Sequence, residues 1–303
     1  MCLKGYNCTI LAYGQSGTGK TYTIQGNEDQ NNNLDNPHRG LIPRCLEFLF
    51  NEISKLESST LKYTVKANFI QIYNEQIYDL GNFNQPQSQS QTPTALKLVE
   101  DRGGNMVVEL VTDCIVDSPE KALEFFYKST KNRIVSATKL NADSSRSHCV
   151  FTLTITSHVL TPTGLAETSS KFNLVDLAGS ESQKKAPTSG LLREQAISIN
   201  KSLSTLGTVI NTLVNTPKGR TAYIRYRDSK LTHLLKDSLG GNSLTSIIGN
   251  ISPCSSTVSE TISTLRFVKR AKLVQNSAKI NRDFKVSVPQ LQTEIEKLKA
   301  EIT

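Results

Sequence analysis

The stretch from Gly14 to Thr21 constrains the fold of this chain more than any other part of the sequence. It reads GQSGTGKT and fits the pattern GxxxxGK(S/T). Glycines let the backbone curl so that its N–H groups surround phosphate oxygens, and a helix that starts directly afterwards points its positive end at them. The context fits, because an apolar, strand-like run from Cys8 to Tyr13 precedes the turn and a helical start follows at Lys20. The stretch therefore predicts a nucleotide phosphate site.

Every residue of this turn is expected to contact the nucleotide, with two side chains in special roles. Lys20 is expected to reach the β- and γ-phosphates, and the Thr21 hydroxyl to ligate Mg²⁺. The pattern also arises by chance in flexible loops, and it does not distinguish one nucleotide from another. The expected binding residues are Gly14, Gln15, Ser16, Gly17, Thr18, Gly19, Lys20 and Thr21.

A second acidic position fits the same site. Asp176 ends the apolar strand that starts at Phe172, where many nucleotide-binding proteins place an Asp that holds the magnesium shell. Gly179, three residues on, offers a backbone N–H to a γ-phosphate. A single Asp at the end of a strand is more often a helix cap or a turn residue, and only its combination with the Gly14 turn favours the metal role.

A run of small hydroxyl residues surrounds one arginine in Asn141-Ala-Asp-Ser144-Ser145-Arg146-Ser147-His148. Taken alone, this run indicates a surface loop with a structural histidine. Together with the phosphate turn, it is a candidate sensor of the γ-phosphate.

The net charge of +8 comes from one part of the chain. Residues 184 to 236 contain ten Lys or Arg and only two acids, while the rest of the sequence is balanced. One interpretation is a solvated basic face. The other is a docking surface for a polyanion, either a nucleic acid or an acidic protein surface.

Composition restricts the class of protein. Hydrophobic residues make up 37% and charged residues 20%, as in ordinary globular proteins, and no apolar stretch is long enough to span a bilayer. Residues 1 to 5 do not resemble a signal peptide. The six cysteines are scattered without metal-type spacing, so we expect free thiols and an intracellular protein.

Strands and helices alternate along the chain, which predicts an α/β layered domain. Near the end, Leu291, Ile295, Leu298 and Ile302 begin a heptad pattern. The expected strands cover residues 8–13, 150–159, 172–177 and 243–251, with a hairpin over 61–80, and the expected helices cover residues 41–56, 118–129, 200–214 and 257–274.

The run Asn141 to His148 and the run Asp176-Leu-Ala-Gly-Ser-Glu181 resemble switch I and switch II of the kinesin family. The resemblance extends from Met1 to about Lys279, and together these motifs are highly specific. Further matching strings are Gly5-Tyr-Asn7, Ile72-Tyr-Asn-Glu-Gln-Ile-Tyr-Asp79, Ile199-Asn-Lys-Ser-Leu203 and Tyr226-Arg-Asp-Ser-Lys-Leu231. Two later strings, Asp237-Ser-Leu-Gly-Gly-Asn242 and Arg270-Ala-Lys-Leu273, are most similar to the kinesin-twelve group.

The resemblance implies a three-layer P-loop NTPase whose central, mostly parallel (mixed) β-sheet is flanked by helices. It divides the chain into a motor domain over 1–275, a neck linker over 276–289 and the start of a neck coiled coil over 290–303. Kinesin motors normally have several strands before the P-loop, so we expect a kinesin fold without its first strands. Such a truncated chain is expected to be unstable or inactive unless those strands are supplied.

The resemblance also implies roles in ATP hydrolysis. Ser145 completes the magnesium site with Thr21 and Asp176, and Ser144 positions the attacking water. Arg146 and Glu181 pair across the two switches when ATP closes the site. No strong general base is needed, because phosphoryl transfer depends mainly on positioning and charge stabilisation.

The implied partner of the basic region is the acidic surface of the microtubule, rather than a membrane or nucleic acid. The motor is expected to move toward plus ends, to dimerise through a coiled coil outside this chain, and to act in the cytoplasm on microtubules, with the mitotic spindle as one candidate location. The expected contacts are Lys184, Lys185, Lys201, Arg227 and Lys230; they weaken with salt, since the screening length is about 8 Å at physiological ionic strength.

Two other functions are open to this sequence. A degenerate kinesin would grip microtubules without turning over ATP; Lys20, Arg146 and Glu181 argue against it, and the absent N-terminal strands argue for it. A GTPase or nucleotide kinase is disfavoured, because the chain has no NKxD guanine motif.

Overall fold

The structure is a computed structural model that describes residues 1–27, 36–83, 94–101, 103–139, 146–161, 164–181, 191–216 and 222–285. Within these ranges only the backbone is described for residues 134–139, 161, 164–165, 191–200 and 283–285. The heptad region 290–303 therefore lies outside the described residues, as do the polar segments 28–35 and 84–93.

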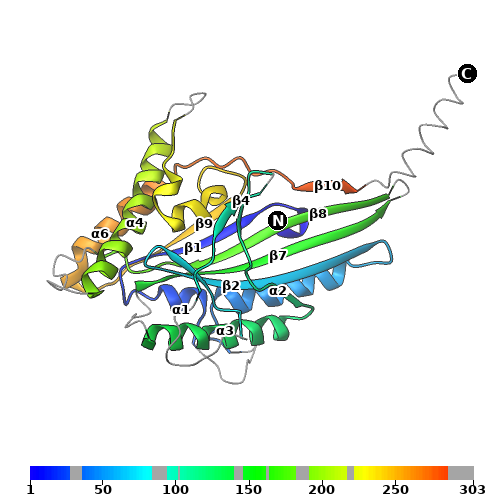
Figure 1. The fold of residues 1–303 in the computed structure, drawn as a ribbon, viewed down its shortest axis with the longest axis horizontal. Coiled ribbons are helices and arrows are strands. Elements are labelled where there is room, and N and C mark those ends of the chain that lie inside the picture. The colour runs from blue at the N-terminus through cyan, green and yellow to red at the C-terminus, as the bar shows by residue number, and fades with distance from the viewer. Residues whose placement is uncertain are drawn as a thin grey trace, which may run out of the picture.

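The described chain forms three layers, with a sheet between two groups of helices (Figure 1). The expected three-layer α/β architecture is confirmed. The strands are β1 (Cys8–Gly14), β2 (Leu61–Tyr73), β3 (Gln76–Asp79), β4 (Leu98–Glu100), β5 (Met106–Val108), β6 (Cys114–Val116), β7 (His148–Thr161), β8 (Gly164–Asp176), β9 (Leu244–Asn250) and β10 (Arg282–Lys285). The helices are α1 (Lys20–Ile24), α2 (Leu41–Leu56), α3 (Pro119–Lys139), α4 (Leu191–Asn215), α5 (Lys230–Leu234) and α6 (Val258–Ala271), with 3-10 turns η1 (Cys2–Lys4), η3 (Tyr226–Asp228), η4 (Lys236–Ser238) and η5 (Ser255–Thr257).

The main sheet has the order β3-β2-β7-β8-β1-β9, with β10 added on β8 and β6 added on β2. The expected mixed pairing is confirmed, but the expectation of a mostly parallel sheet is wrong. Only β1 pairs in parallel, with β8 on one side and β9 on the other. The other strand pairs of the described sheet are antiparallel. Two of them, β2 with β3 and β7 with β8, are hairpins of strands that follow each other directly.

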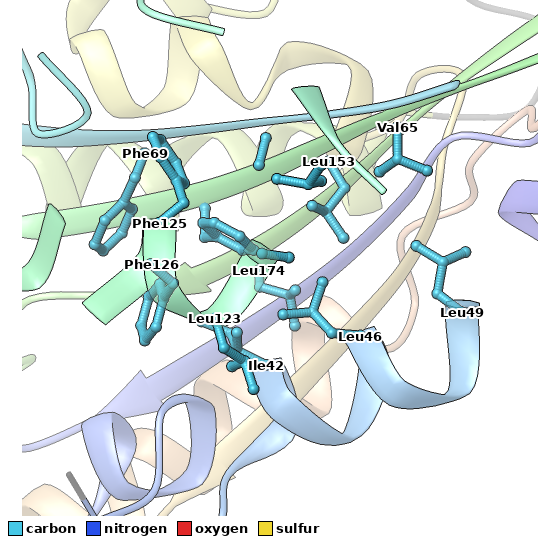
Figure 2. Close-up of a cluster of buried hydrophobic side chains, with 14 of the residues drawn as sticks. Ile42, Leu46, Leu49, Val65, Phe69, Leu123, Phe125, Phe126, Leu153 and Leu174 are labelled. Atoms are coloured by element: carbon cyan, nitrogen blue, oxygen red, sulfur yellow. The ribbon is translucent and has the colours of Figure 1, made fainter. Parts of the chain in front are cut away.

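Side chains alternate between the two faces of the sheet and build a core on each. One core lies between the sheet and helices α2 and α3, with Phe69 of β2 beside Phe126 of α3 (Figure 2). Phe151 of β7 contacts the same Phe126 ring. The other core joins the opposite face to α4, α5 and α6, as in the stacking of Tyr13 on Phe267 with ring centroids 3.8 Å apart. The two cores pack on both faces of the interior strands β1 and β8 and so fix the place where these strands end.

Several elements begin or end away from their expected bounds. The strand expected from Phe172 starts at Gly164. The apolar pattern that marks the rest of the strand is absent from this added part, whose half-buried polar residues are Glu167, Thr168, Ser169 and Lys171. The helix α4 starts at Leu191, nine residues before the expected start. Leu192, Ala196 and Ile199 continue the spacing of the later apolar residues of α4, a continuation that the polar residues between them obscured.

The segment after α6 returns to the sheet. β10 pairs with β8, and the Asn281 side chain donates to the side chain of Asn7 (3.0 Å) and the backbone oxygen of Ser169 (3.0 Å). The Asn242 side chain donates to the Asn281 side chain at 2.8 Å. These bonds hold the start of the expected neck linker against the end of the sheet at which β1 begins.

The described helices include none that is both long and apolar enough to cross a membrane. All six cysteines are free, as expected.

Replacing Phe126 with alanine should lower the free energy of unfolding by about 3–5 kcal/mol, because the ring is fully buried and the surrounding rings cannot close the cavity. Urea unfolding followed by circular dichroism measures this change. The matched control is Phe48→Ala on α2, where the ring is 68% exposed and the loss should stay within about 0.5 kcal/mol. Equal losses in the two variants would contradict this description of the core.

Candidate nucleotide-binding site

The Gly14 turn lies between β1 and α1, as the sequence predicts. Gly17 and Gly19 have positive φ angles of 79° and 89°, and a Cβ atom at either position would meet no atom within 4 Å. Both glycines therefore face open space in a backbone conformation that other residues rarely adopt. This is the concave turn that phosphate binding requires.

Lys20 lies inside the turn, where its side chain is 7% exposed. Its ammonium group donates to the backbone oxygen of Gln15 at 2.9 Å. Burial lowers the pKa of Lys20, and the nearby carboxylates of Asp176 and Glu181 oppose this shift. A buried cation whose ammonium group donates to a backbone oxygen of the turn is well placed to attract a phosphate.

Asp176 reaches the turn from the end of β8. Its Oδ2 atom accepts from the Thr21 hydroxyl at 2.8 Å and lies 3.4 Å from Nη1 of Arg133, a buried arginine on α3. Its Oδ1 atom is buried and has no hydrogen-bond partner among the described residues. A free carboxylate oxygen beside a threonine hydroxyl is the kind of donor set that Mg²⁺ prefers, so the residues present fit this ion.

Glu181 closes over the turn from the other side. Its two carboxylate oxygens accept from the Ser16 backbone N–H at 2.8 Å and from the Ser16 hydroxyl at 2.5 Å. Gly179 leaves room for this contact, because a Cβ atom there would lie 2.2 Å from the Ser16 hydroxyl oxygen. The structure thus brings Lys20, Asp176, Gly179 and Glu181 together at one turn.

Switch I is described only in part. Ser144 and Ser145 lie outside the described residues, so their roles remain predictions. Arg146 lies close enough to Tyr73 to counteract the rise that burial causes in the pKa of that tyrosine. Because both oxygens of Glu181 bind Ser16 here, the expected pairing of Arg146 with Glu181 also remains a prediction.

His148 joins three parts of the site. Its Nδ1 atom accepts from the Ala178 backbone N–H at 3.0 Å, so its Nε2 atom carries the proton and donates to the Ser202 hydroxyl of α4 at 2.8 Å. Burial lowers the pKa of His148 to about 3, and Arg133 and Lys20 add to this effect. The histidine is structural, as expected, but it also connects switch II to α4.

Arg133 is the site residue that the sequence did not reveal. It carries no motif and lies in the middle of a helix, 43 residues before its partner Asp176. A buried arginine that pairs with a carboxylate orients that carboxylate, so Arg133 is a positioning residue for Asp176.

The expected contacts to an acidic partner lie on neighbouring elements. Lys201 is exposed on α4, Arg227 lies on η3 and Lys230 begins α5, and α4 packs against both η3 and α5. Lys184 and Lys185 lie outside the described residues.

The comparisons with known proteins agree with these motifs. Residues 1–274 match the model of the kinesin motor domain family. The chain is 47% identical over 306 residues to the kinesin-like protein KIN-12D of Arabidopsis thaliana, a match that covers all of this chain and 11% of the relative. It is 45% identical over 305 residues to the kinesin-like protein KIF15-B of Xenopus laevis, again over the whole chain and over 21% of the relative.

Solved structures agree as well. A fast kinesin superposes with a TM-score of 0.81 at 41% identity, over 94% of this chain and 75% of the other. The KIF14 dimer in complex with a microtubule and AMP-PNP superposes with a TM-score of 0.82 at 39% identity, over 97% of this chain and 78% of the other. The resemblance to kinesins and to the kinesin-twelve group is therefore confirmed, although the chain spans only 11% and 21% of the two curated relatives.

The burial of His148 predicts a specific loss of stability in acid. The histidine titrates near pH 6.5 in the unfolded chain and at about 3 in the folded one, so the unfolded state takes up a proton first as the pH falls. The free energy of unfolding should lose up to about 1.4 kcal/mol per pH unit between these values. Urea unfolding between pH 6.5 and pH 4.5 should show a shallower decline for His148→Asn than for the parent, and equal slopes would contradict the assignment.

Proposed function

The chain belongs to the kinesin motor family, and on this premise we propose that it is an ATP-driven microtubule motor that binds ATP with Mg²⁺, hydrolyses it, and couples hydrolysis to microtubule binding and movement. The observation that carries the proposal is the contact of Glu181 with Ser16. A nucleotide phosphate bound in the turn would lie beside this contact, so its binding or release would change the position of switch II.

The chain's own residues supply positioning and charge, which is most of what phosphoryl transfer requires. Lys20 would bind the terminal phosphates, and Thr21 and Asp176 would hold Mg²⁺, with Arg133 orienting Asp176. The bound metal would neutralise charge on the phosphates. Ser144 and Ser145 of switch I would complete the metal site and position the attacking water, and the Gly179 backbone N–H would bind the γ-phosphate.

The route from the nucleotide to the track would pass through His148. Movement of switch II would shift the Ala178 N–H. The imidazole of His148 accepts from this N–H and donates to the Ser202 hydroxyl, so the shift would reach α4. Ser202 follows Lys201, an expected microtubule contact on the same helix. A change at the phosphate could therefore alter how α4 presents its cationic face, as in other switches that couple a γ-phosphate to loop order.

The C-terminal segment supports the direction of movement and the assembly that we propose. Pairing of β10 with β8 would dock a neck linker over 276–289 along the motor, and the heptads over 290–303 would begin a coiled coil. On this basis we propose movement toward plus ends, dimerisation beyond this chain, and a place on cytoplasmic microtubules, including those of the spindle.

A degenerate kinesin that binds microtubules without turning over ATP is the alternative. The intact contacts of Lys20, Asp176 and Glu181 favour turnover, because a pure binder would not need a buried lysine inside the phosphate turn.

For a motor, microtubules should stimulate the ATPase rate of the full-length protein, and Lys20→Ala should reduce that rate by about 10² or more, because the main cation for the phosphates is lost. The matched control is Lys55→Ala on α2, where the ammonium lies 2.6 Å from a carboxylate oxygen of Glu52 and the rate should not change. Steady-state ATPase assays measure both. Equal microtubule affinity with an ATP analogue and with ADP would refute the motor. A parent that binds microtubules without stimulated ATP turnover would favour the degenerate alternative, and an unaffected rate in Lys20→Ala would contradict the role proposed for Lys20.

A further inference from the structure

Basic residues recur at every third position in the segment Tyr226–Lys236, which we call the cationic segment. It consists of η3, α5 and the start of η4. Burial lowers the pKa of His233, and the positive charges of Arg227 and Lys230 lower it further. These two cations therefore lie near His233. The basic residues of the cationic segment are Arg227, Lys230, His233 and Lys236.

Glu75 binds the middle of the cationic segment. It lies in the two-residue turn between β2 and β3, where Asn74 and Glu75 have φ angles of 48° and 57°. This left-handed conformation is uncommon outside glycine but matches a tight hairpin turn. The turn therefore holds the Glu75 carboxylate in one place against α5.

The Glu75 carboxylate binds backbone and hydroxyl groups rather than the lysine charge. Its Oε2 atom accepts from the Lys230 backbone N–H at 2.8 Å, and its Oε1 atom accepts from the Ser229 hydroxyl at 3.1 Å. Among the described residues, no carboxylate forms an ion pair with the Lys230 ammonium group. Glu75 thus fixes the start of α5 while the Lys230 charge stays available.

Glu100 binds the two ends of the cationic segment in a different way. Its Oε1 atom lies 2.8 Å from the Lys236 ammonium group, and its Oε2 atom lies 3.7 Å from Nη2 of Arg227. The hydrogen bond from Lys236 lowers the pKa of Glu100, which keeps it ionised. The Arg227 side chain is 75% exposed, so an acidic group from outside can reach it and compete with Glu100.

We propose that these two carboxylates have opposite effects on microtubule binding: Glu75 positions the cationic segment for the acidic track, whereas Glu100 competes with the track for Arg227. The proposal rests on the proposed motor function, because it concerns the affinity of one expected contact surface for the microtubule. Glu75 is a positioning residue that acts through Lys230.

Charge alone predicts a different result. Changing either glutamate to glutamine removes one negative charge near the cations, so simple electrostatics would strengthen binding to an acidic surface in both cases. Loss of a carboxylate that caps a helix start costs about three- to fivefold in the population of the ordered helix end. For Glu75 this loss opposes the charge effect, whereas Glu100 accepts no comparable bond from a backbone group of the described residues.

The test is the affinity of Glu75→Gln and Glu100→Gln for polymerised tubulin, by co-sedimentation with an ATP analogue at low and physiological salt. Glu75→Gln should bind about threefold more weakly and Glu100→Gln about two- to threefold more tightly, the latter gain shrinking as salt rises. In ATPase assays the microtubule concentration at half-maximal rate should shift in the same directions, while the maximal rate stays the same. Glu52→Gln on α2, which pairs with Lys55, carries the same charge change on the far side of the sheet and should change neither quantity.

If Glu75→Gln does not fold, Ser229→Ala removes the bond from the Ser229 hydroxyl to Glu75, together with the bond that this hydroxyl accepts from the Leu231 backbone N–H, without changing any charge, and should also weaken binding. Equal tightening by both glutamine variants, or no change in either, would overturn the proposal. A parent that does not bind microtubules would overturn the proposed function itself, and this inference with it.

Discussion

The parallel pairing of β1 with β8 is the constraint on which the site depends. In this register Ala12 lies opposite Asp176, so both strands end at the same edge of the sheet. The turn that follows β1 and the switch that follows β8 must then meet, and they do so through Thr21 with Asp176 and Ser16 with Glu181. The ends of neighbouring parallel strands are the usual place for a ligand in such sheets.

A second set of buried polar groups extends from this edge to the helices. The antiparallel pairing of β7 with β8 places Cys149 opposite Asp176 and so brings His148 to the backbone of switch II. Its other nitrogen binds Ser202 on α4, and the imidazole is buried with both nitrogens bonded. Since a buried polar group without a partner is costly, switch II and α4 cannot move independently without breaking one of these bonds.

Hydrogen bonds also join two motifs that are far apart in the sequence. The string around Glu75 and the string around Lys230 are separated by 155 residues, yet one binds the other directly. The hairpin between β2 and β3 therefore does more than connect two strands, because its turn holds the start of α5. Residues expected to bind nucleotide and residues expected to bind the track are thus attached to one continuous sheet.

The sequence by itself predicted the turn at Gly14, the place of Asp176 beside it and most helices and strands, because each depends on a pattern that is local in the chain. It did not reveal that the sheet is mostly antiparallel, that Arg133 pairs with Asp176, or that Glu75 caps α5. Those features depend on strand register and on which helix faces which strand. Only the tertiary structure decides them, because they arise from packing between residues that no local spacing relates.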